Sequence, residues 1–140
     1  MKKVGSLPGT LSFRYNGVNI GLNSNAADII AALGSPNDVF EAPSCAFEGV
    51  DKFLYYNGFV INTYPKNGQD NVLSIILNGA QTPEGLGIGM SVDDMVAIYG
   101  ENYYGSAGAY VYSVKNVELT VLTEGSSVVE ISYYYTAAAS

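Results

Sequence analysis

The chain has 140 residues, of which 48% are hydrophobic and 14% are charged, so it has enough apolar side chains for one core and too few charges for a disordered chain. Six basic and thirteen acidic residues leave a net charge of −7, which disfavours contact with the phosphate backbone of a nucleic acid. Histidine is absent and Cys45 is the single cysteine, so the chain lacks the commonest general base and cannot form an internal disulfide. We predict one domain over residues 1–140.

The N-terminal segment predicts a short hairpin. Met1-Lys2-Lys3 is typical of the start of a bacterial export signal, but Val4–Thr10 contains no apolar run, so we expect no signal core in this stretch. Asn16-Gly17 between two β-like runs favours a two-residue turn, and the hairpin would cover about residues 10–20. No segment of the chain reaches the roughly eighteen consecutive apolar residues of a transmembrane helix.

Two similar segments, about 66 residues apart, predict two helices. Ala26–Gly34 reads AADIIAALG and Val92–Gly100 reads VDDMVAIYG. Each has apolar residues at helical spacing, acidic residues in the first turn and a final glycine, which favours a helix end. Each is followed by a loop and then by short β-like runs, and a period of this length is typical of a duplicated half-domain.

The residues before each helix predict where it begins. Ser24 or Asn25 can cap the first helix, because a side-chain oxygen at this position accepts a hydrogen bond from an amide of the first turn. Ser91 can cap the second helix, with Asp94 as its capping-box partner. Both helices are therefore expected to have a defined start.

Alternation of apolar and polar residues predicts the strands. In the first copy we expect strands at Lys52–Tyr56, Phe59–Tyr64 and Val72–Leu77, and Asn57-Gly58 predicts a two-residue hairpin turn. In the second copy, the residues expected on the apolar face are Val117, Leu119, Val121, Val129, Ile131 and Tyr133.

Together these elements predict an α+β fold of two tandem helix-plus-antiparallel-sheet repeats that form one domain, with the helices on one face of the sheet. The repeats would cover about residues 18–78 and 86–135, and Asn78–Gly85 would link them. Exposed strand edges would allow edge pairing, so we expect a monomer or a weak dimer.

Three stretches of the chain resemble a known family. They are Ser44–Lys52, Gly58–Pro65, and Thr82–Gly85 leading to Ile88–Ser91. These motifs are similar to the β-lactamase-inhibitor-protein-like (BLIP-like) tandem-repeat domain of Gram-positive bacterial surface lipoproteins of unassigned function. The resemblance implies two helix-bearing halves sharing a sheet, a lipid-anchored cell-surface or secreted location, and binding in place of catalysis. The N-terminal segment leaves a cytoplasmic location as the alternative. The sequence departs from the lipoprotein pattern, because it shows neither a leader nor a lipid-bearing N-terminal cysteine.

No catalytic, cofactor or metal site is predicted from the polar residues. Cys45 has no histidine to activate it as a nucleophile, and we expect it to be a small buried hydrophobe. Asp93-Asp94 fits the charge preference of a helix N-terminus better than a pair of hydrolytic carboxylates. Glu48 and Asp51 are interpreted as turn residues, and Gly85–Gly89 lacks the Lys-Ser/Thr of a phosphate-binding loop.

Tyrosine is the informative residue type, with 12 copies and no tryptophan. A sheet covered by helices on one side usually turns polar residues to water on the other, but here the alternation predicts aromatic residues there. Tyrosine gives a large contact area at low entropic cost and is common in recognition surfaces, although strand propensity alone also favours it. The residues predicted to form this binding face are Phe53, Tyr55, Tyr64, Tyr110, Tyr112 and Tyr134.

These features predict a non-catalytic module that binds a protein, or as a second choice a glycan, through the aromatic face. The alternative hypothesis is a protein inhibitor of a secreted hydrolase. Such an inhibitor would act through a loop, and the candidate is Tyr103–Gly108 with its residues Tyr103 and Tyr104. Neither hypothesis requires a cofactor or a nucleic-acid partner.

Overall fold

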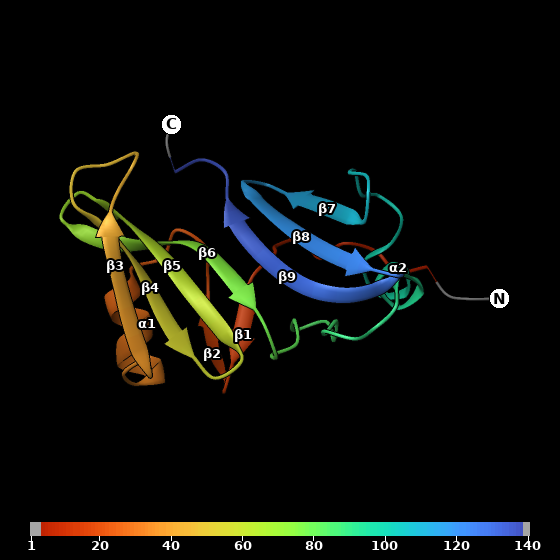
Figure 1. Cartoon of the computed structure of the whole chain (residues 1–140), viewed down its shortest axis with the longest axis horizontal. Coiled ribbons are helices and arrows are strands. Elements are labelled where there is room, and N and C mark those ends of the chain that lie inside the picture. The colour runs from red at the N-terminus through yellow and green to blue at the C-terminus, as the bar shows by residue number, and fades with distance from the viewer. Residues whose placement is uncertain (1–3, 139–140) are drawn as a thin grey trace.

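The computed structural model of the chain describes residues 4–138, and most of its regular structure is β-strand (Figure 1). A hairpin of β1 (Phe13–Tyr15) and β2 (Val18–Ile20) forms a sheet of its own. The helices are α1 (Ala26–Leu33) and α2 (Val92–Tyr99). The strands of the main sheet are β3 (Asp38–Pro43), β4 (Val50–Tyr56), β5 (Phe59–Lys66), β6 (Gln69–Leu77), β7 (Ala109–Val114), β8 (Val117–Glu124) and β9 (Ser127–Tyr135).

The main sheet joins the two halves of the chain. Its strand order is β3-β4-β5-β6-β9-β8-β7, and all neighbouring strands are antiparallel. β6 and β9 meet in the middle, where Ile75 pairs with Tyr133 and Leu77 pairs with Ile131. In Figure 1, α1 lies behind β3 and β4, and α2 lies behind the right-hand end of β8 and β9. One face of the sheet is therefore turned away from the helices.

The predicted fold class, an α+β domain of two helix-plus-sheet repeats, is wrong. Strands hold 46% of the structure and helices 12%, and the strands form one seven-stranded antiparallel sheet and one small two-stranded sheet. Each helix has eight residues, or about two turns. The shortness of the helices is the physical reason for the difference, because about two turns of helix cover only a small part of the sheet that β6 and β9 join. The fold is mostly β.

The predicted helix starts and the N-terminal turn are confirmed. Asn25 accepts a hydrogen bond from an amide of the first turn of α1 at 3.0 Å. Ser91 Oγ accepts one from the Asp94 amide, and the Asp94 carboxylate accepts one from the Ser91 amide, both at 3.0 Å. Asn16 and Gly17 have φ angles of 49° and 77°, and this pair of positive values defines a two-residue hairpin turn.

A β-bulge changes the orientation of one residue that we expected on the apolar face. The register of β8 and β9 shifts between Leu122 and Thr123, so β9 contains one extra residue at this point. Val128 is consequently buried, whereas Val129 is 45% exposed, and its predicted place on the apolar face is wrong. A regular alternation therefore describes β9 only on one side of the bulge.

Candidate functional site

The sheet face turned away from the helices, here named the open face, carries exposed aromatic rings. Phe40, Tyr55 and Tyr134 are 57%, 40% and 45% exposed. Phe40 pairs with Phe53 across β3 and β4, and their ring centroids lie 6.0 Å apart. The register places these residues in two neighbouring rows across the sheet. The first row is Phe40, Phe53, Asn62, Ser74, Tyr134, Glu118 and Ser113, and the second is Asp38, Tyr55, Val60, Ile76, Ser132, Thr120 and Val111.

Two tyrosines predicted for the open face lie on the opposite face of the sheet. Tyr112 pairs with the core residue Leu119 and is fully buried. Its hydroxyl donates a hydrogen bond to the Gly100 carbonyl at 2.7 Å, which satisfies this polar group inside the core. Tyr110, two residues earlier in β7, has the same orientation and packs partly buried against the core. Val111 takes the open-face position between them. The predicted assignment of alternate β7 residues to the two faces of the sheet is therefore wrong by one residue.

Tyr64 is also wrongly assigned to an accessible binding face, since it is only 2% exposed. The ring of Phe47, from the loop between β3 and β4, packs on it with centroids 5.0 Å apart. The Tyr64 hydroxyl hydrogen-bonds to the side chain of Asn23. The predicted residues that do lie on the open face are Phe53, Tyr55 and Tyr134.

Phe40 was missing from the prediction, although it is the most exposed of these rings. It lies in β3, an edge strand of six residues that we did not predict. Acidic residues at Asp38 and Glu41 interrupt the apolar pattern there, so the segment reads as a loop. The signal that could have revealed the strand is the pair Val39-Phe40, because β-branched and aromatic residues favour strands.

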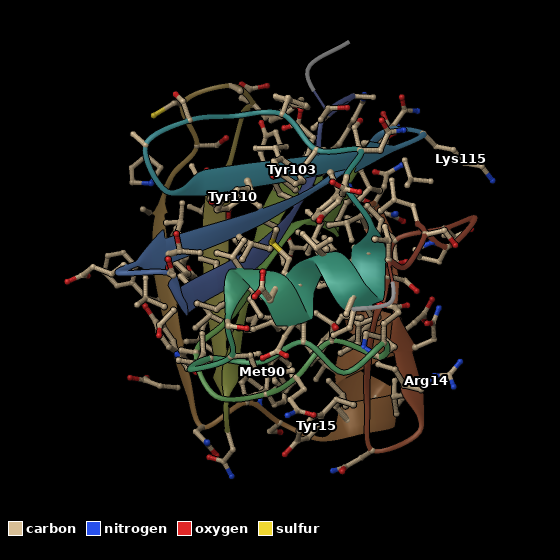
Figure 2. All side chains as sticks on the ribbon, turned by 90° about the vertical axis from the view of Figure 1, so that its right-hand side faces the viewer. Arg14, Tyr15, Met90, Tyr103, Tyr110 and Lys115 are labelled. Carbon is tan, nitrogen blue, oxygen red and sulfur yellow. The ribbon has the colours of Figure 1, made fainter. Side chains whose placement is uncertain are left out.

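The candidate loop after α2 is held against the sheet. Tyr103 packs edge-on against Tyr110 with ring centroids 4.8 Å apart, and Figure 2 shows the two side chains next to each other. Tyr104 forms an isolated β-bridge with Val111, and its hydroxyl hydrogen-bonds to Glu118 on the open face. Tyr104 is 54% exposed, so these contacts extend the open face at its β7 end.

The open face is acidic around its aromatic rings. Asp38 and Glu118 are the charged residues of the two rows defined above, and neither row contains a lysine or an arginine. Aromatic rings attract cations through their faces, and nearby carboxylates add to this attraction. The open face therefore combines exposed aromatic rings with negative charge.

A concave surface lies on the helix side of the sheet, between α1 and strands β3 to β5. We name it the α1 groove. Its volume is about 760 Å³, which is within the usual size range of ligand-binding sites. Its walls include Ala27, Ile30, Val39, Glu41, Lys52 and Leu54.

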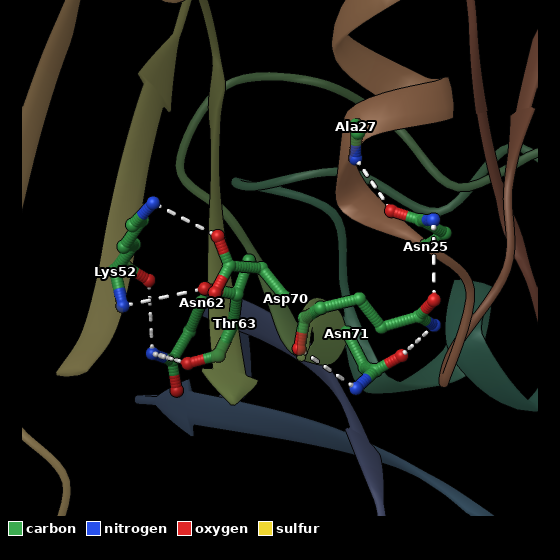
Figure 3. A network of polar contacts seen from close by, with 8 residues as sticks. Asn25, Ala27, Lys52, Asn62, Thr63, Asp70 and Asn71 are labelled. Carbon is green, nitrogen blue, oxygen red and sulfur yellow. Dashed lines mark hydrogen bonds and ion pairs between the residues drawn. The ribbon is translucent and has the colours of Figure 1, made fainter. Parts of the chain in front are cut away.

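Polar contacts hold the floor of the α1 groove (Figure 3). Lys52 Nζ lies 2.9 Å from Asp70 Oδ2, and this hydrogen bond raises the pKa of Lys52. The Lys52 amide donates to Thr63 Oγ1 at 3.3 Å, and the Asn62 side chain donates to the Lys52 carbonyl at 3.2 Å. Glu41 adds a second carboxylate near the Lys52 ammonium. Two carboxylates beside one ammonium give this end of the groove a net negative charge.

Buried tyrosines form a separate polar cluster inside the core. The Tyr99 hydroxyl lies 2.6 Å from a Glu84 carboxylate oxygen and 2.7 Å from Thr82 Oγ1. Burial raises the pKa of Tyr99 and Tyr133, and it raises the pKa of Tyr112 to about 12. These phenols stay neutral at physiological pH, so the cluster supports the fold and does not supply a base.

The remaining candidate residues do not gather into a reactive site. Cys45 is exposed in the loop between β3 and β4, and the expectation of a buried cysteine is wrong because Phe47 is the loop residue that packs on the sheet. Within residues 4–138, no three His, Cys, Asp or Glu side chains are grouped so that they could hold a metal ion. Over the same described range, neither α1 nor α2 has the length and apolar character needed to cross a membrane.

Comparison with known proteins shows a likeness in fold alone. No family model matches the chain, and no curated protein sequence matches it. A solved structure with a similar fold is that of a cysteine-rich secretory protein from Staphylococcus aureus, with a TM-score of 0.57 and 8% sequence identity. The match covers 96% of this chain and 51% of that protein, so the chain spans about half the length of its structural neighbour. The BLIP-like resemblance stays a prediction.

Proposed function

We propose that this chain is a non-catalytic binding module that recognises another protein through the open face. The observation that carries the proposal is the group of exposed rings of Phe40, Tyr55 and Tyr134 on one sheet face. The side of an antiparallel sheet that faces water is usually polar, and a group of exposed apolar side chains there is typical of an interaction site.

The chemistry of the open face favours a protein over a glycan. Aromatic residues are enriched in the buried centres of protein interfaces, where they contribute most of the binding energy. The rings are spread over β3, β4 and β9, which suits a broad contact better than the enclosure of a single sugar. Asp38 and Glu118 would meet basic residues of the partner at the rim.

The proposal includes a location at the cell surface or in the secreted space. The resemblance of Ser44–Lys52 and Gly58–Pro65 to segments of surface lipoproteins supports this location. The solved protein of similar fold is itself described as secretory.

Site-specific photo-crosslinking tests the proposal. A photoreactive phenylalanine analogue would replace Tyr55 or Tyr134 on the open face, and Ile88 as a control, since Ile88 is 39% exposed but lies outside the strands. The variants would be irradiated in extracts of the cells that make the protein. We expect one protein to be crosslinked from both open-face positions and not from position 88.

The binding constant of that purified protein would then be measured with Tyr55→Ser/Tyr134→Ser. We expect affinity to fall by at least about tenfold, as is usual when interface aromatic residues are removed. The control Val4→Ser/Ile88→Ser removes two exposed apolar side chains elsewhere and should leave affinity unchanged. Equal crosslinking from all three positions, or unchanged affinity of the folded open-face variant, would rule the proposal out.

A further inference from the structure

The edge strand β3 directs backbone groups away from the sheet. One residue beyond its end, the Ser44 amide donates to the Gly49 carbonyl of the neighbouring chain segment at 3.0 Å. Hydrogen-bonded and non-hydrogen-bonded pairs alternate in an antiparallel ladder. Since Ser44 bonds to the neighbouring segment, Pro43, Glu41 and Val39 belong to non-hydrogen-bonded pairs with β4. The amide and carbonyl groups of Val39 and Glu41, and the carbonyl of Pro43, therefore point outward. Proline fits this position, because its missing amide would not have bonded to β4.

The residue paired with Glu41 gives the same assignment. Lys52 pairs with Glu41 across β3 and β4. The Lys52 amide and carbonyl instead bond to the side chains of Thr63 and Asn62 on β5, on the other side of β4 (Figure 3). The outward direction of the Glu41 backbone therefore follows from two independent sets of contacts.

The two outer edges of the main sheet differ in how they are protected. At β7, the Tyr104 amide donates to the Val111 carbonyl at 3.0 Å and the Val111 amide donates to the Tyr104 carbonyl at 2.8 Å. At β3, the contact found among residues 4–138 is local, because the Val39 amide donates to Asp38 Oδ1 of the preceding residue at 2.9 Å. The Glu41 amide and the outward carbonyls of β3 are left for another strand to bond.

The α1 groove adjoins this same edge, since Val39 and Glu41 both line it. Figure 1 shows α1 behind β3. Successive side chains of a strand point to opposite faces of a sheet. A strand added at β3 would therefore place alternate side chains in the α1 groove, next to Ile30 of α1. The side chains between them would lie beside Phe40 on the open face.

We propose that β3 binds an extended peptide segment of a partner protein as an eighth, antiparallel strand. Cross-strand pairing determines the side chains that fit. A basic residue would lie opposite Glu41, an aromatic residue opposite Phe40, and a β-branched apolar residue opposite Val39. In an antiparallel strand these three follow one another in that order from the N-terminus.

Charge favours such a segment over a second copy of this chain. Each copy carries a net charge of −7. Pairing of two β3 strands would bring Asp38 and Glu41 of one copy towards the same residues of the other, and like charges across strands are destabilising. A basic segment is instead attracted by the Glu41 carboxylate and by the net negative charge of the groove floor.

Binding of short labelled peptides to the full chain tests this proposal by fluorescence anisotropy. The probe is a blocked peptide of about eight residues whose centre reads lysine–tyrosine–valine between threonines, because a strand of this length spans β3. Two controls have the centre reversed, or glutamate in place of lysine. We expect the probe to bind at least about tenfold more tightly than either control, because only the probe pairs correctly with Glu41 and Val39.

Four variants separate the edge from general charge effects. Glu41→Lys should weaken binding of the probe by at least about tenfold and favour the glutamate peptide. Glu101→Lys makes the same charge change at an exposed residue after α2 and should change affinity by less than about twofold. Glu41→Pro removes the outward amide while keeping the bonds to β4, so it should abolish binding, whereas Glu41→Gln should retain part of it.

Amide exchange in the unaltered protein gives a readout that does not depend on how the variants fold. With saturating probe, exchange of the Glu41 amide should slow by at least about tenfold, and amides of β7 should be unaffected. Tyr134→Ser should bind the probe as well as the native chain, so failure of the open-face proposal is distinguishable from failure of this one. Equal binding of the three peptides, an unchanged Glu41 amide, or a stable β3-paired dimer in sedimentation would overturn the proposal.

Discussion

Neighbouring tyrosines of this chain have opposite environments. Tyr133 is fully buried in the core, whereas Tyr134, the next residue, is 45% exposed on the open face. Their side chains point to opposite faces of β9, so position in the strand decides the environment of each ring. A buried tyrosine hydroxyl usually has a hydrogen-bond partner, and that of Tyr112 is the Gly100 carbonyl. The same residue type can thus pack in the core or lie exposed on the open face.

Alkaline pH should weaken the fold through Tyr112. Burial raises its pKa to about 12 from the ordinary value of 10.0 that applies to the unfolded chain. The stability that the neutral phenol contributes is complete below about pH 10 and is lost as the pH rises towards 12. At pH 7, Tyr112→Phe should cost about 1 kcal/mol through the lost hydrogen bond. At pH 11, ionisation of Tyr112 in the unfolded chain should lower the free energy of unfolding of the native protein by about 1.4 kcal/mol, a loss that Tyr112→Phe does not have.

The measurement is urea unfolding of the native chain and of Tyr112→Phe between pH 7 and pH 11. The other tyrosines are common to both proteins, so the difference in unfolding free energy isolates Tyr112. We expect this difference to shrink to zero or change sign by pH 11. A difference that stays constant over this range would show that Tyr112 is not held neutral by burial.

The two helices are short elements whose ends matter more than their interiors. A helix of eight residues has little stability of its own, so fixed ends and packing against the sheet must hold it. In α2, the capping box of Ser91 and Asp94 satisfies amides at the start, and Met95 and Tyr99 are buried in the core. The cap thus positions two core side chains.

Loss of the cap should destabilise the whole fold. Ser91→Ala removes the acceptor for the Asp94 amide, and we expect the free energy of unfolding to fall by about 1 kcal/mol, within the range of 0.5–2 kcal/mol that is usual for such caps. Ser106→Ala is a matched control at an exposed loop position and should change stability by less than about 0.5 kcal/mol. Equal effects of the two substitutions in urea unfolding would contradict a role for the capping box.

At the scale of the molecule, one seam holds the two halves together. The pairing of β6 with β9 extends over four residue pairs, from Ser74 with Tyr134 to Leu77 with Ile131. One hydrophobic core contains buried residues from both sides of this seam, including Leu54 from β4. Since the buried apolar residues of the described range 4–138 form this shared core, we expect the chain to unfold in a single transition.

Shortening a buried side chain in the pairing of β6 with β9 should therefore lower the stability of both halves equally. Leu77 is fully buried, and Leu77→Ala should lower the free energy of unfolding by about 2–5 kcal/mol. Hydrogen exchange of the slowest amides in β5 and in β8 should accelerate by the same factor, because both report the global transition. Acceleration confined to β5 and its neighbours would show that the halves unfold separately.

The sequence by itself determined the local structure. The helix starts at Asn25 and Ser91 and the turn at Asn16-Gly17 depend on residues that are adjacent in the chain, so their chemistry is visible without the fold. Three of the predicted open-face residues followed from strand alternation in the same way. The tertiary structure alone decided how the halves combine, because the pairing of β6 with β9 joins segments that are far apart in the sequence.

Tertiary contacts also decided which side chains a partner can reach. The bulge in β9 moved Val129 to the surface, and the packing of Phe47 on Tyr64 buried a predicted binding residue. β3 was not predicted because Asp38 and Glu41 interrupt its apolar pattern, and its position at the sheet edge is a property of strand order. The candidate sites of this protein therefore depend on strand order and register, which residues separated along the chain determine together.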